Sequence, residues 1–263
     1  MAITQKGFIF KRVEVKYMLT DEQYEGLFKM IGDKIQIDDY GLSTICNLYF
    51  DNTNDELIKT SLAKPKYKEK VRLRSYGVPK SLNSKVFLEI KKKYQGIVYK
   101  RRVSLTLREV NDYIENGVKP KDSQILRELD YTINRYRIFP KIFIAYDREA
   151  YYAKDDTEFR MTFDKNIRYR RSDVKLEAGD QGTQLIDHSY HLLEVKAGGA
   201  YPEWLIKAFS ELKIYPTSFS KYGAIYKKEM MERLEAASAI SSVTGYNPNT
   251  VYRNVAGSVQ SVS

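Results

Sequence analysis

The chain has 263 residues, enough for one or two domains, and 43% of them are hydrophobic, so a real core can form. Lys and Arg total 44 against 34 Asp and Glu, and this net charge of +10 favours nucleic acid, anionic lipid or phosphate compounds as partners. The single cysteine, Cys46, excludes a disulfide framework and a cysteine-rich zinc site. With no apolar signal segment and no apolar run of about 18 residues, we expect no membrane span and a soluble, cytoplasmic protein.

Eight strands are predicted from alternating side chains, at about 8–17, 43–50, 68–76, 85–93, 97–105, 141–151, 157–164 and 192–196. Helices lie between and after them. Capping boxes begin two of them, at Thr20 with Gln23 and at Thr106 with Glu109, and others cover 123–135, follow Pro202, and run from about Ser220 to Leu234. Residues 1–235 are expected to form one domain, and the Ser- and Ala-rich segment 236–263 a weakly ordered tail.

Charged side chains share one parity on six of these strands. The sets are Arg12, Glu14 and Lys16; Lys70, Arg72 and Arg74; Glu89 and Lys91; Lys100 and Arg102; Glu158 and Arg160; Glu194 and Lys196. A single strand of this kind is usually the solvated edge of a sheet, but the recurrence indicates one surface lined mainly by Arg and Lys. If the sheet closes, these cations face one another, and an anionic ligand or interspersed carboxylates must offset their repulsion.

Such a surface suits phosphates and a metal ion. Arg grips two phosphate oxygens at once, Lys acts as a point charge, and glutamates can bind a divalent cation that bridges phosphate oxygens. Phosphoryl transfer mainly needs alignment and charge neutralisation. The sequence contains no Gly-rich P-loop, no dinucleotide fingerprint and no Gly-x-Ser-x-Gly elbow, and its two histidines are too few for a three-His zinc site.

Several motifs, in this order along one chain, resemble the triphosphate tunnel metalloenzymes, and within them the VTC-type polyphosphate polymerase domain. The resemblance covers about residues 8–230. Its carriers are Arg-x-Glu-x-Lys at 12–16, Asn-Leu-Tyr-Phe-Asp at 47–51, Lys-x-Arg-x-Arg at 70–74, Leu-Glu-Ile-Lys at 88–91, Tyr-Lys-Arg-Arg at 99–102, Phe-Arg-Met-Thr-Phe-Asp at 159–164, Leu-Glu-Val-Lys at 193–196 and Ser-Lys-Tyr at 220–222.

The resemblance implies an α+β fold, with an eight-stranded antiparallel β tunnel or barrel and flanking helices. It implies a phosphotransferase that uses ATP and a divalent metal, Mn²⁺ or Mg²⁺, to make inorganic polyphosphate. The cations expected to neutralise the transferring group are Arg72, Arg74, Lys91 and Arg160, and those expected to bind substrate are Arg12, Lys16, Lys100, Arg102, Lys196 and Lys221. The metal is assigned to Glu194, with Glu14 and Glu89 as further carboxylates.

Arg12 departs from the broader tunnel family, which has Glu-x-Glu-x-Lys at this motif. One carboxylate is replaced by a cation, which weakens a two-metal hydrolase and fits a site for a long anion.

Three alternatives stay open: a triphosphatase or polyphosphatase on the same fold, a non-catalytic polyphosphate binder, and a nucleic-acid binder. Specific nucleic-acid binding is not expected, because Tyr17, Tyr99 and Phe159 lie on the parity opposite the cations and could not stack bases beside them.

Overall fold

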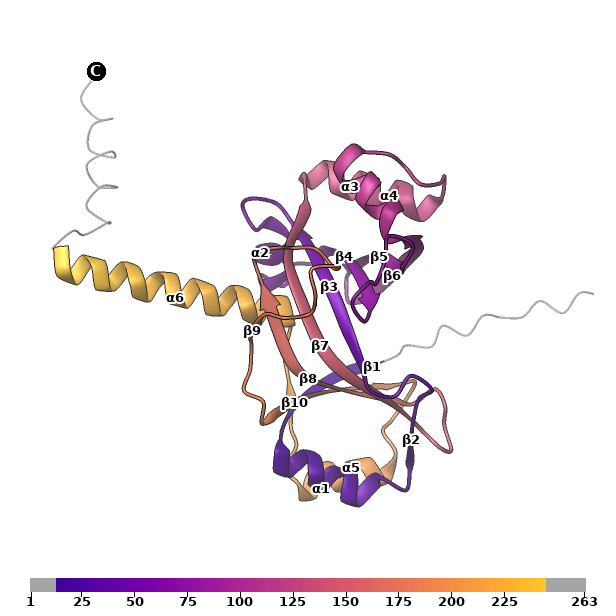
Figure 1. Cartoon of the computed structure of the whole chain (residues 1–263). Coiled ribbons are helices and arrows are strands. Elements are labelled where there is room, and N and C mark those ends of the chain that lie inside the picture. The colour runs from indigo at the N-terminus through magenta and orange to yellow at the C-terminus, as the bar shows by residue number, and fades with distance from the viewer. Residues whose placement is uncertain (1–12, 245–263) are drawn as a thin grey trace, which may run out of the picture.

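The computed structural model describes residues 13–244, which form one large antiparallel sheet with six helices around it (Figure 1). The strands along the sheet follow the order β11-β1-β10-β8-β7-β3-β4-β5-β6, while β2 pairs with β7 and β9 pairs with β8. Their bounds are β1 (Val13–Thr20), β2 (Ile35–Ile37), β3 (Ser43–Asp51), β4 (Tyr67–Tyr76), β5 (Lys85–Tyr94), β6 (Ile97–Thr106), β7 (Phe139–Ala153), β8 (Arg160–Arg170), β9 (Thr183–Gln184), β10 (Tyr190–Ala197) and β11 (Pro216–Thr217).

The mixed α+β architecture and all eight predicted strands are confirmed, although residues 8–12 of the first predicted strand lie outside the described part. The sheet of the described residues is open and does not close into a barrel. The strand order ends at β6 on one side and at β11 on the other, and these two edges do not pair with each other. The free edge at β6 carries Lys100, Arg101 and Arg102, and charges of this kind discourage a further strand from pairing there.

The helices are α1 (Asp21–Ile31), α2 (Glu56–Leu62), α3 (Leu107–Asn116), α4 (Gln124–Tyr136), α5 (Glu203–Glu211) and α6 (Lys221–Thr244). Both predicted capping boxes form, with Thr20 accepting from the Gln23 amide and Thr106 from the Glu109 amide. Figure 1 shows α1 and α5 together at one end of the sheet and α3 and α4 at the other. Helices α2 and α6 pack on the sheet between these ends, where Ile58, Tyr222 and Ile225 are buried against Ile142 and Ile144.

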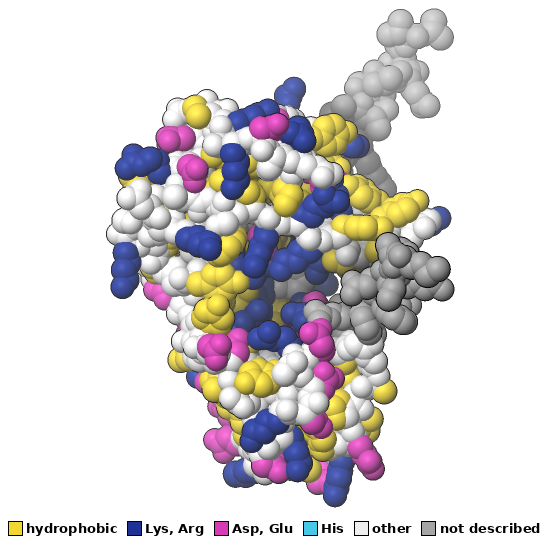
Figure 2. Space-filling view, turned by 90° about the vertical axis from the view of Figure 1, so that its right-hand side faces the viewer, with side chains coloured by type: hydrophobic (Ala, Val, Ile, Leu, Met, Phe, Trp, Pro, Cys, Tyr) yellow, Lys and Arg dark blue, Asp and Glu magenta, His cyan; other side chains and the backbone are white. Residues whose placement is uncertain are grey.

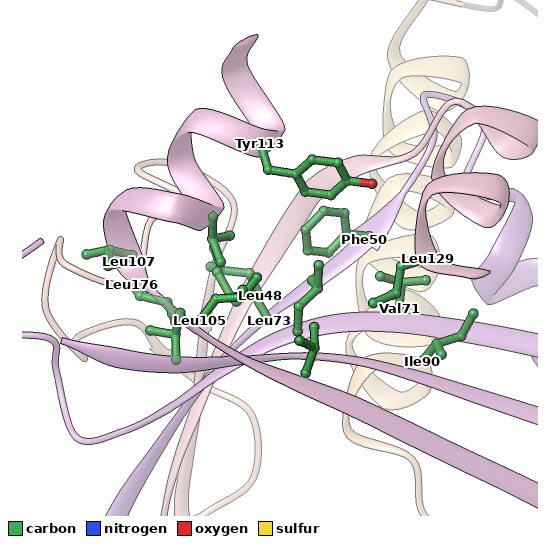
Figure 3. Packing of buried hydrophobic residues seen from close by; sticks show 14 of the residues in the cluster. Leu48, Phe50, Val71, Leu73, Ile90, Leu105, Leu107, Tyr113, Leu129 and Leu176 are labelled. Atoms are coloured by element: carbon green, nitrogen blue, oxygen red, sulfur yellow. The ribbon is translucent and has the colours of Figure 1, made fainter. Parts of the chain in front are cut away.

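The core beneath α3 and α4 decides which way the cations of β4 point. Val71 and Leu73 are buried against Phe50, Leu105 and Leu129 (Figure 3). Burying each such side chain is worth about 1.5–3 kcal/mol, and neighbouring residues of a strand point to opposite faces. The apolar residues of β4 therefore hold the alternate residues of this strand on the other face.

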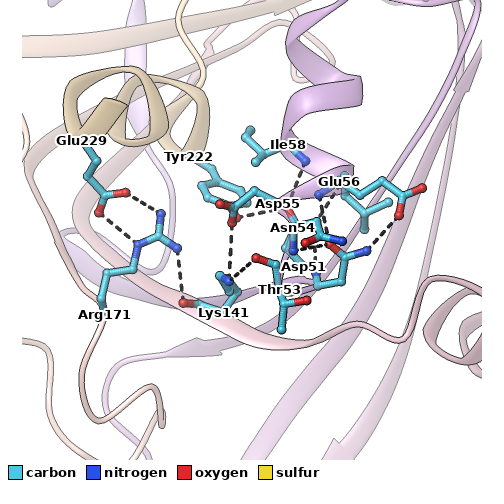
Figure 4. Close-up of polar contacts among 12 residues, drawn as sticks. Asp51, Thr53, Asn54, Asp55, Glu56, Ile58, Lys141, Arg171, Tyr222 and Glu229 are labelled. Carbon is cyan, nitrogen blue, oxygen red and sulfur yellow. Dashed lines mark hydrogen bonds and ion pairs between the residues drawn. The ribbon is translucent and has the colours of Figure 1, made fainter. Parts of the chain in front are cut away.

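Helix α2 was not predicted from the sequence. Its N-terminus is capped by a carboxylate of the preceding strand, β3. Asp51 at the end of β3 accepts hydrogen bonds from the amides of Leu57 and Ile58, both at 2.9 Å (Figure 4). The same carboxylate accepts a hydrogen bond from the Tyr222 hydroxyl at 3.1 Å. Asp51 therefore ties the start of α2 to the first turn of α6.

Helix α6 is held at its base and then extends away from the body (Figure 1). Arg171 makes a two-pronged contact with Glu229, at 3.0 and 2.6 Å (Figure 4). The helix continues to Thr244, beyond the predicted domain boundary at 235, and residues 245–263 of the predicted tail lie outside the described part. These contacts fix the start of α6, including Lys221, against the sheet.

Candidate phosphate-binding site

Figure 2 shows a hollow in one face of the molecule with Lys and Arg side chains gathered around it. Strand register brings cations and carboxylates from β1, β4, β5, β6, β7, β8 and β10 onto one face of the sheet, because directly paired residues share a face. The residues placed there are Glu14, Lys16, Lys70, Arg72, Arg74, Glu89, Lys91, Lys100, Arg102, Arg148, Arg160, Asp164, Glu194 and Lys196. We call this the cationic face.

Arg72 and Arg74 form the deepest part of the cationic face. The Arg72 Nε atom lies 2.6 Å from a Glu89 carboxylate oxygen, and its Nη1 donates to the Tyr49 hydroxyl at 3.4 Å. Burial raises the pKa of the Glu89 carboxyl, but Arg72, Arg74 and Lys100 outweigh this and lower it. Glu89 is therefore held as an anion that offsets part of the positive charge.

The charge of Arg74 is met by neutral groups. Its side chain, in a residue that is only 7% exposed, donates from Nε to the Asn47 amide oxygen at 3.0 Å and from Nη2 to the Tyr146 hydroxyl at 3.2 Å. A buried guanidinium with neutral partners keeps much of its attraction for an incoming anion. Arg74 is thus prepared to bind a phosphate oxygen.

The positive potential of these arginines and lysines lowers the pKa values of two neighbouring tyrosines, Tyr49 and Tyr146. Burial raises the pKa of the Tyr49 phenol, but Arg72, Arg74 and Lys70 outweigh it and lower the pKa to about 7. Burial also raises the pKa of the Tyr146 phenol. The cations Arg74, Arg148 and Lys221 outweigh this effect, so the pKa of Tyr146 is lowered. An anion placed here meets strongly attractive surroundings before any conformational change.

A second group of cations faces the arginines from β7 and α6. Arg148 holds Asp164 with two hydrogen bonds, at 2.6 and 2.8 Å, and Lys221 contacts the same carboxylate while lying 4.0 Å from the Tyr146 ring centre. Asp164 is 1% exposed; burial raises its pKa, but Lys221 and Arg148 outweigh this and keep it well below its usual range. Asp164 therefore positions two cations at the hollow.

Three lysines form a row across neighbouring strands of the cationic face, and no carboxylate lies in this row. Lys70, Lys91 and Lys100 are directly paired across β4, β5 and β6. Burial, followed by mixed contributions from neighbouring charges, lowers the pKa of Lys70 and of Lys100 to about 8. Three cations in one row repel one another, and an anion lying across them would relieve that repulsion.

The opposite wall carries the carboxylate predicted to bind metal. Glu194 lies 2.5 Å from the Lys196 ammonium and 3.7 Å from that of Lys16, and Lys16 also donates to the Phe219 carbonyl. Burial raises the pKa of Glu194, but Lys196, Lys16 and Arg148 outweigh it and lower the pKa to about 2. The neighbouring cations thus favour the charged form of Glu194 on the cationic face.

Among the described residues, no three His, Cys, Asp or Glu side chains are grouped to hold a metal by themselves. Glu194 can give a charged oxygen, Glu14 is exposed and shares its face one strand away, and Glu89 is engaged with Arg72. This donor set fits a cation shared between one or two carboxylates and phosphate oxygens, which is the usual arrangement for Mg²⁺.

Three of the predicted residues lie apart from the deep group. Arg160 is exposed at the start of β8 and contacts Asp38 at 3.1 Å, and Lys91 is exposed in the lysine row. Arg102 is exposed too, with its guanidinium 4.9 Å from the Phe87 ring centre, while Arg12 lies outside the described residues. The roles assigned to all of these residues stay predictions.

Sequence reasoning gave no role to Tyr49, Tyr146, Arg148 or Asp164. Tyr49 and Asp164 stood inside motifs that carried the resemblance, without a function of their own. Arg148 and Tyr146 are two residues apart and thus share a parity, which is the signal that could have placed Arg148 on the cationic face.

The chain matches a known protein family and resembles solved structures in fold. The sequence profile of the VTC domain matches residues 11–229. The fold aligns with a protein of Bacillus halodurans described as a candidate adenylate cyclase, with a TM-score of 0.50 and 13% identity over 80% of this chain and 93% of that one. The PH1819 protein of Pyrococcus horikoshii aligns with a TM-score of 0.43 and 13% identity, covering 82% of this chain and 99% of the other. A search of curated proteins gave no match.

Proposed function

Because this chain belongs to the VTC domain family and has the fold of triphosphate tunnel proteins, we propose that it is a polyphosphate polymerase. It would transfer the γ-phosphoryl group of ATP to a growing inorganic polyphosphate chain. The observation that carries the proposal is the cationic face, where Arg72 and Arg74 meet Arg148 and Lys221 around one hollow. An anion with several phosphates in a row is the ligand that such a distribution of charge fits best.

The residues divide the work between binding and neutralisation. Arg72 and Arg74 would hold the triphosphate from β4, while Arg148 and Lys221 would neutralise the equatorial oxygens of the transferring group from the other side. The lysine row would accept the polyphosphate chain. A divalent cation, Mn²⁺ or Mg²⁺, held by Glu194 and phosphate oxygens would supply further charge neutralisation.

The transfer needs no nucleophile from the protein. A terminal oxygen of phosphate or polyphosphate forms a bond to the γ-phosphorus as the bond to the β–γ bridging oxygen breaks, and ADP leaves. The second ionisation of a phosphate has a pKa of about 6, so the attacking oxygen is already charged at neutral pH. A general base is therefore unnecessary.

The carboxylates of the site are not suited to activate water for hydrolysis. Attack by water is aided by a base whose pKa lies near the working pH. The carboxylates Glu194, Asp164 and Glu89 all have lowered pKa values and are engaged by cations. They are poor acceptors for the proton of an attacking water molecule.

Nucleic-acid binding is less well supported. Tyr49 and Tyr146 lie among the cations, but Tyr146 is buried with the Arg148 guanidinium 5.1 Å from its ring centre, and the Tyr49 ring packs against Tyr222, so neither offers a free face on which a base could stack.

The test is incubation of the purified protein with ATP and Mn²⁺ or Mg²⁺, with products resolved by size and stained for polyphosphate. A ladder of polymers that requires ATP supports the proposal. Release of orthophosphate alone would favour a triphosphatase on this fold, and binding of polyphosphate without turnover would favour a non-catalytic binder.

A further inference from the structure

The tip of the hairpin between β5 and β6 exposes a group of large apolar side chains. Tyr94, Ile97, Val98 and Tyr99 are all exposed, and Ile97 reaches 58%. The turn at Gln95–Gly96 has positive φ at both residues, as a tight two-residue hairpin requires. Neighbouring Tyr67 is exposed too, with its ring centre 6.4 Å from that of Tyr94. We call these five residues the apolar tip.

The apolar tip has side chains on both faces of the hairpin. Ile97 is paired with Tyr94 and Val98 with Lys93, so Ile97 and Tyr99 share one face while Val98 lies on the other. A hairpin that packs on a protein core is apolar on one face and polar on the other. Apolar residues on both faces of an exposed turn suit insertion of the turn itself into an apolar medium.

Lysines surround the apolar tip. Lys66 accepts a backbone hydrogen bond from Gln95 at 2.9 Å, which places it beside the turn, and Lys68 is directly paired with Lys93. Lys64, Lys66 and Lys93 are exposed. Lys64, Lys66, Lys68 and Lys93 together form a positive group just behind the apolar residues, which we call the lysine collar.

We propose that the apolar tip docks on a lipid bilayer that contains anionic headgroups. The apolar side chains enter the boundary between headgroups and acyl chains, and the lysine collar contacts headgroup phosphates. Either contribution alone gives weak, reversible binding, while an apolar insertion combined with a basic patch gives stable attachment. This inference is independent of the reaction at the cationic face.

Two other occupants fit less well. A second copy pairing along the free edge of β6 would bring Lys100, Arg101 and Arg102 close to their own counterparts, which is unfavourable. A nucleic acid would use the tyrosine rings and lysines, but Ile97 and Val98 at the apex have no surface on which bases stack.

Cosedimentation of the full chain with vesicles tests the proposal. Vesicles of phosphatidylcholine alone are compared with vesicles that also contain phosphatidylglycerol, and tripolyphosphate is added so that the cationic face is occupied. Binding should require phosphatidylglycerol. Ile97→Ser should weaken partitioning by about tenfold, and Lys66→Gln or Lys93→Gln by roughly fivefold each.

The matched control is Ile206→Ser on α5, because Ile206 is 54% exposed, close to the value for Ile97. This control should bind like the unmodified chain. Equal binding by Ile97→Ser and Ile206→Ser would overturn the proposal, as would equal binding to vesicles without phosphatidylglycerol. If Ile97→Ser weakens binding to a single-stranded RNA but not to anionic vesicles, relative to Ile206→Ser, the apolar tip is a nucleic-acid surface and the proposal is overturned.

A second measurement reports on insertion directly. Cys46 is the only cysteine and is buried, so Val98→Cys can be labelled selectively with an environment-sensitive fluorophore. The emission should shift to shorter wavelength with anionic vesicles. The same label at Ile206→Cys should show no shift, and an unshifted label at position 98 would exclude insertion.

Discussion

Replacing Asp164 with Asn separates structural charge balance from ligand binding. The side chain keeps its size, but Arg148 and Lys221 lose the carboxylate that both contact. Because Asp164 is 1% exposed, the loss leaves two poorly compensated cations in a hollow, and such changes cost about 3–5 kcal/mol. For a chain of this size, 3 kcal/mol corresponds to a fall in melting temperature of roughly 6–12 °C.

The matched control is Asp38→Asn, which removes the partner of the exposed Arg160. A surface pair of this kind is worth about 0–1 kcal/mol, so the melting temperature should change little. Tripolyphosphate should then narrow the gap between Asp164→Asn and the unmodified chain, because its oxygens replace the missing carboxylate and ligand binding stabilises the folded state. Thermal melts with and without tripolyphosphate measure both effects.

The pH dependence gives a further check on Asp164. Its folded-state pKa lies below the unfolded value of about 3.9, so its contribution to stability is complete above that value and is lost as the pH falls through the folded pKa. The stability gap between Asp164→Asn and the unmodified chain should therefore close only in acid. Equal melting temperatures for Asp164→Asn and Asp38→Asn at neutral pH would refute the reasoning.

Three further predictions concern activity and binding. Arg148→Gln should lower the rate of ATP turnover roughly 100-fold, as expected for loss of a group that stabilises transition-state charge, whereas Arg160→Gln should change it much less; a larger loss with Arg160→Gln would support the assignment of Arg160 made from sequence. Glu194→Gln should lose activity at limiting Mn²⁺ while polyphosphate binding, measured by calorimetry, stays equal or tightens, because a repelling carboxylate is gone; full activity would exclude Glu194 as the essential ligand. The affinity for polyphosphate should fall as the pH rises through about 8, because Lys70 and Lys100 lose their charge there; affinity that stays constant until the pH nears the usual pKa of lysine would contradict this.

The strands and the direction of their charged side chains could be predicted from sequence because both follow from a period of two. Val71 and Leu73 had to be buried, so Arg72 had to point the other way. The parity of a residue in a strand predicts which face of the sheet its side chain lies on, but not how deeply that side chain is buried. Arg160 has the same parity as Asp164, yet it lies at the exposed start of β8, where Asp38 is its partner.

The features that sequence reasoning missed depend on contacts between distant segments. Arg148 is surrounded on its own strand by Tyr146 and other uncharged residues of the same parity, so no repeated charge marks it. Its role becomes visible only when β8 brings Asp164 beside it. Helix α2 was missed for a similar reason, because its cap comes from Asp51 in β3 rather than from the residue that precedes the helix.

The most direct test of the account is ³¹P NMR of the full chain with ATP and Mg²⁺, followed over time beside Arg74→Ala. The account predicts that ADP and the signal of internal polyphosphate groups grow together, with little orthophosphate, and that Arg74→Ala produces neither while keeping a similar melting temperature. Growth of ADP and orthophosphate without internal phosphate groups would contradict the central claim, and so would undiminished polymer formation by Arg74→Ala.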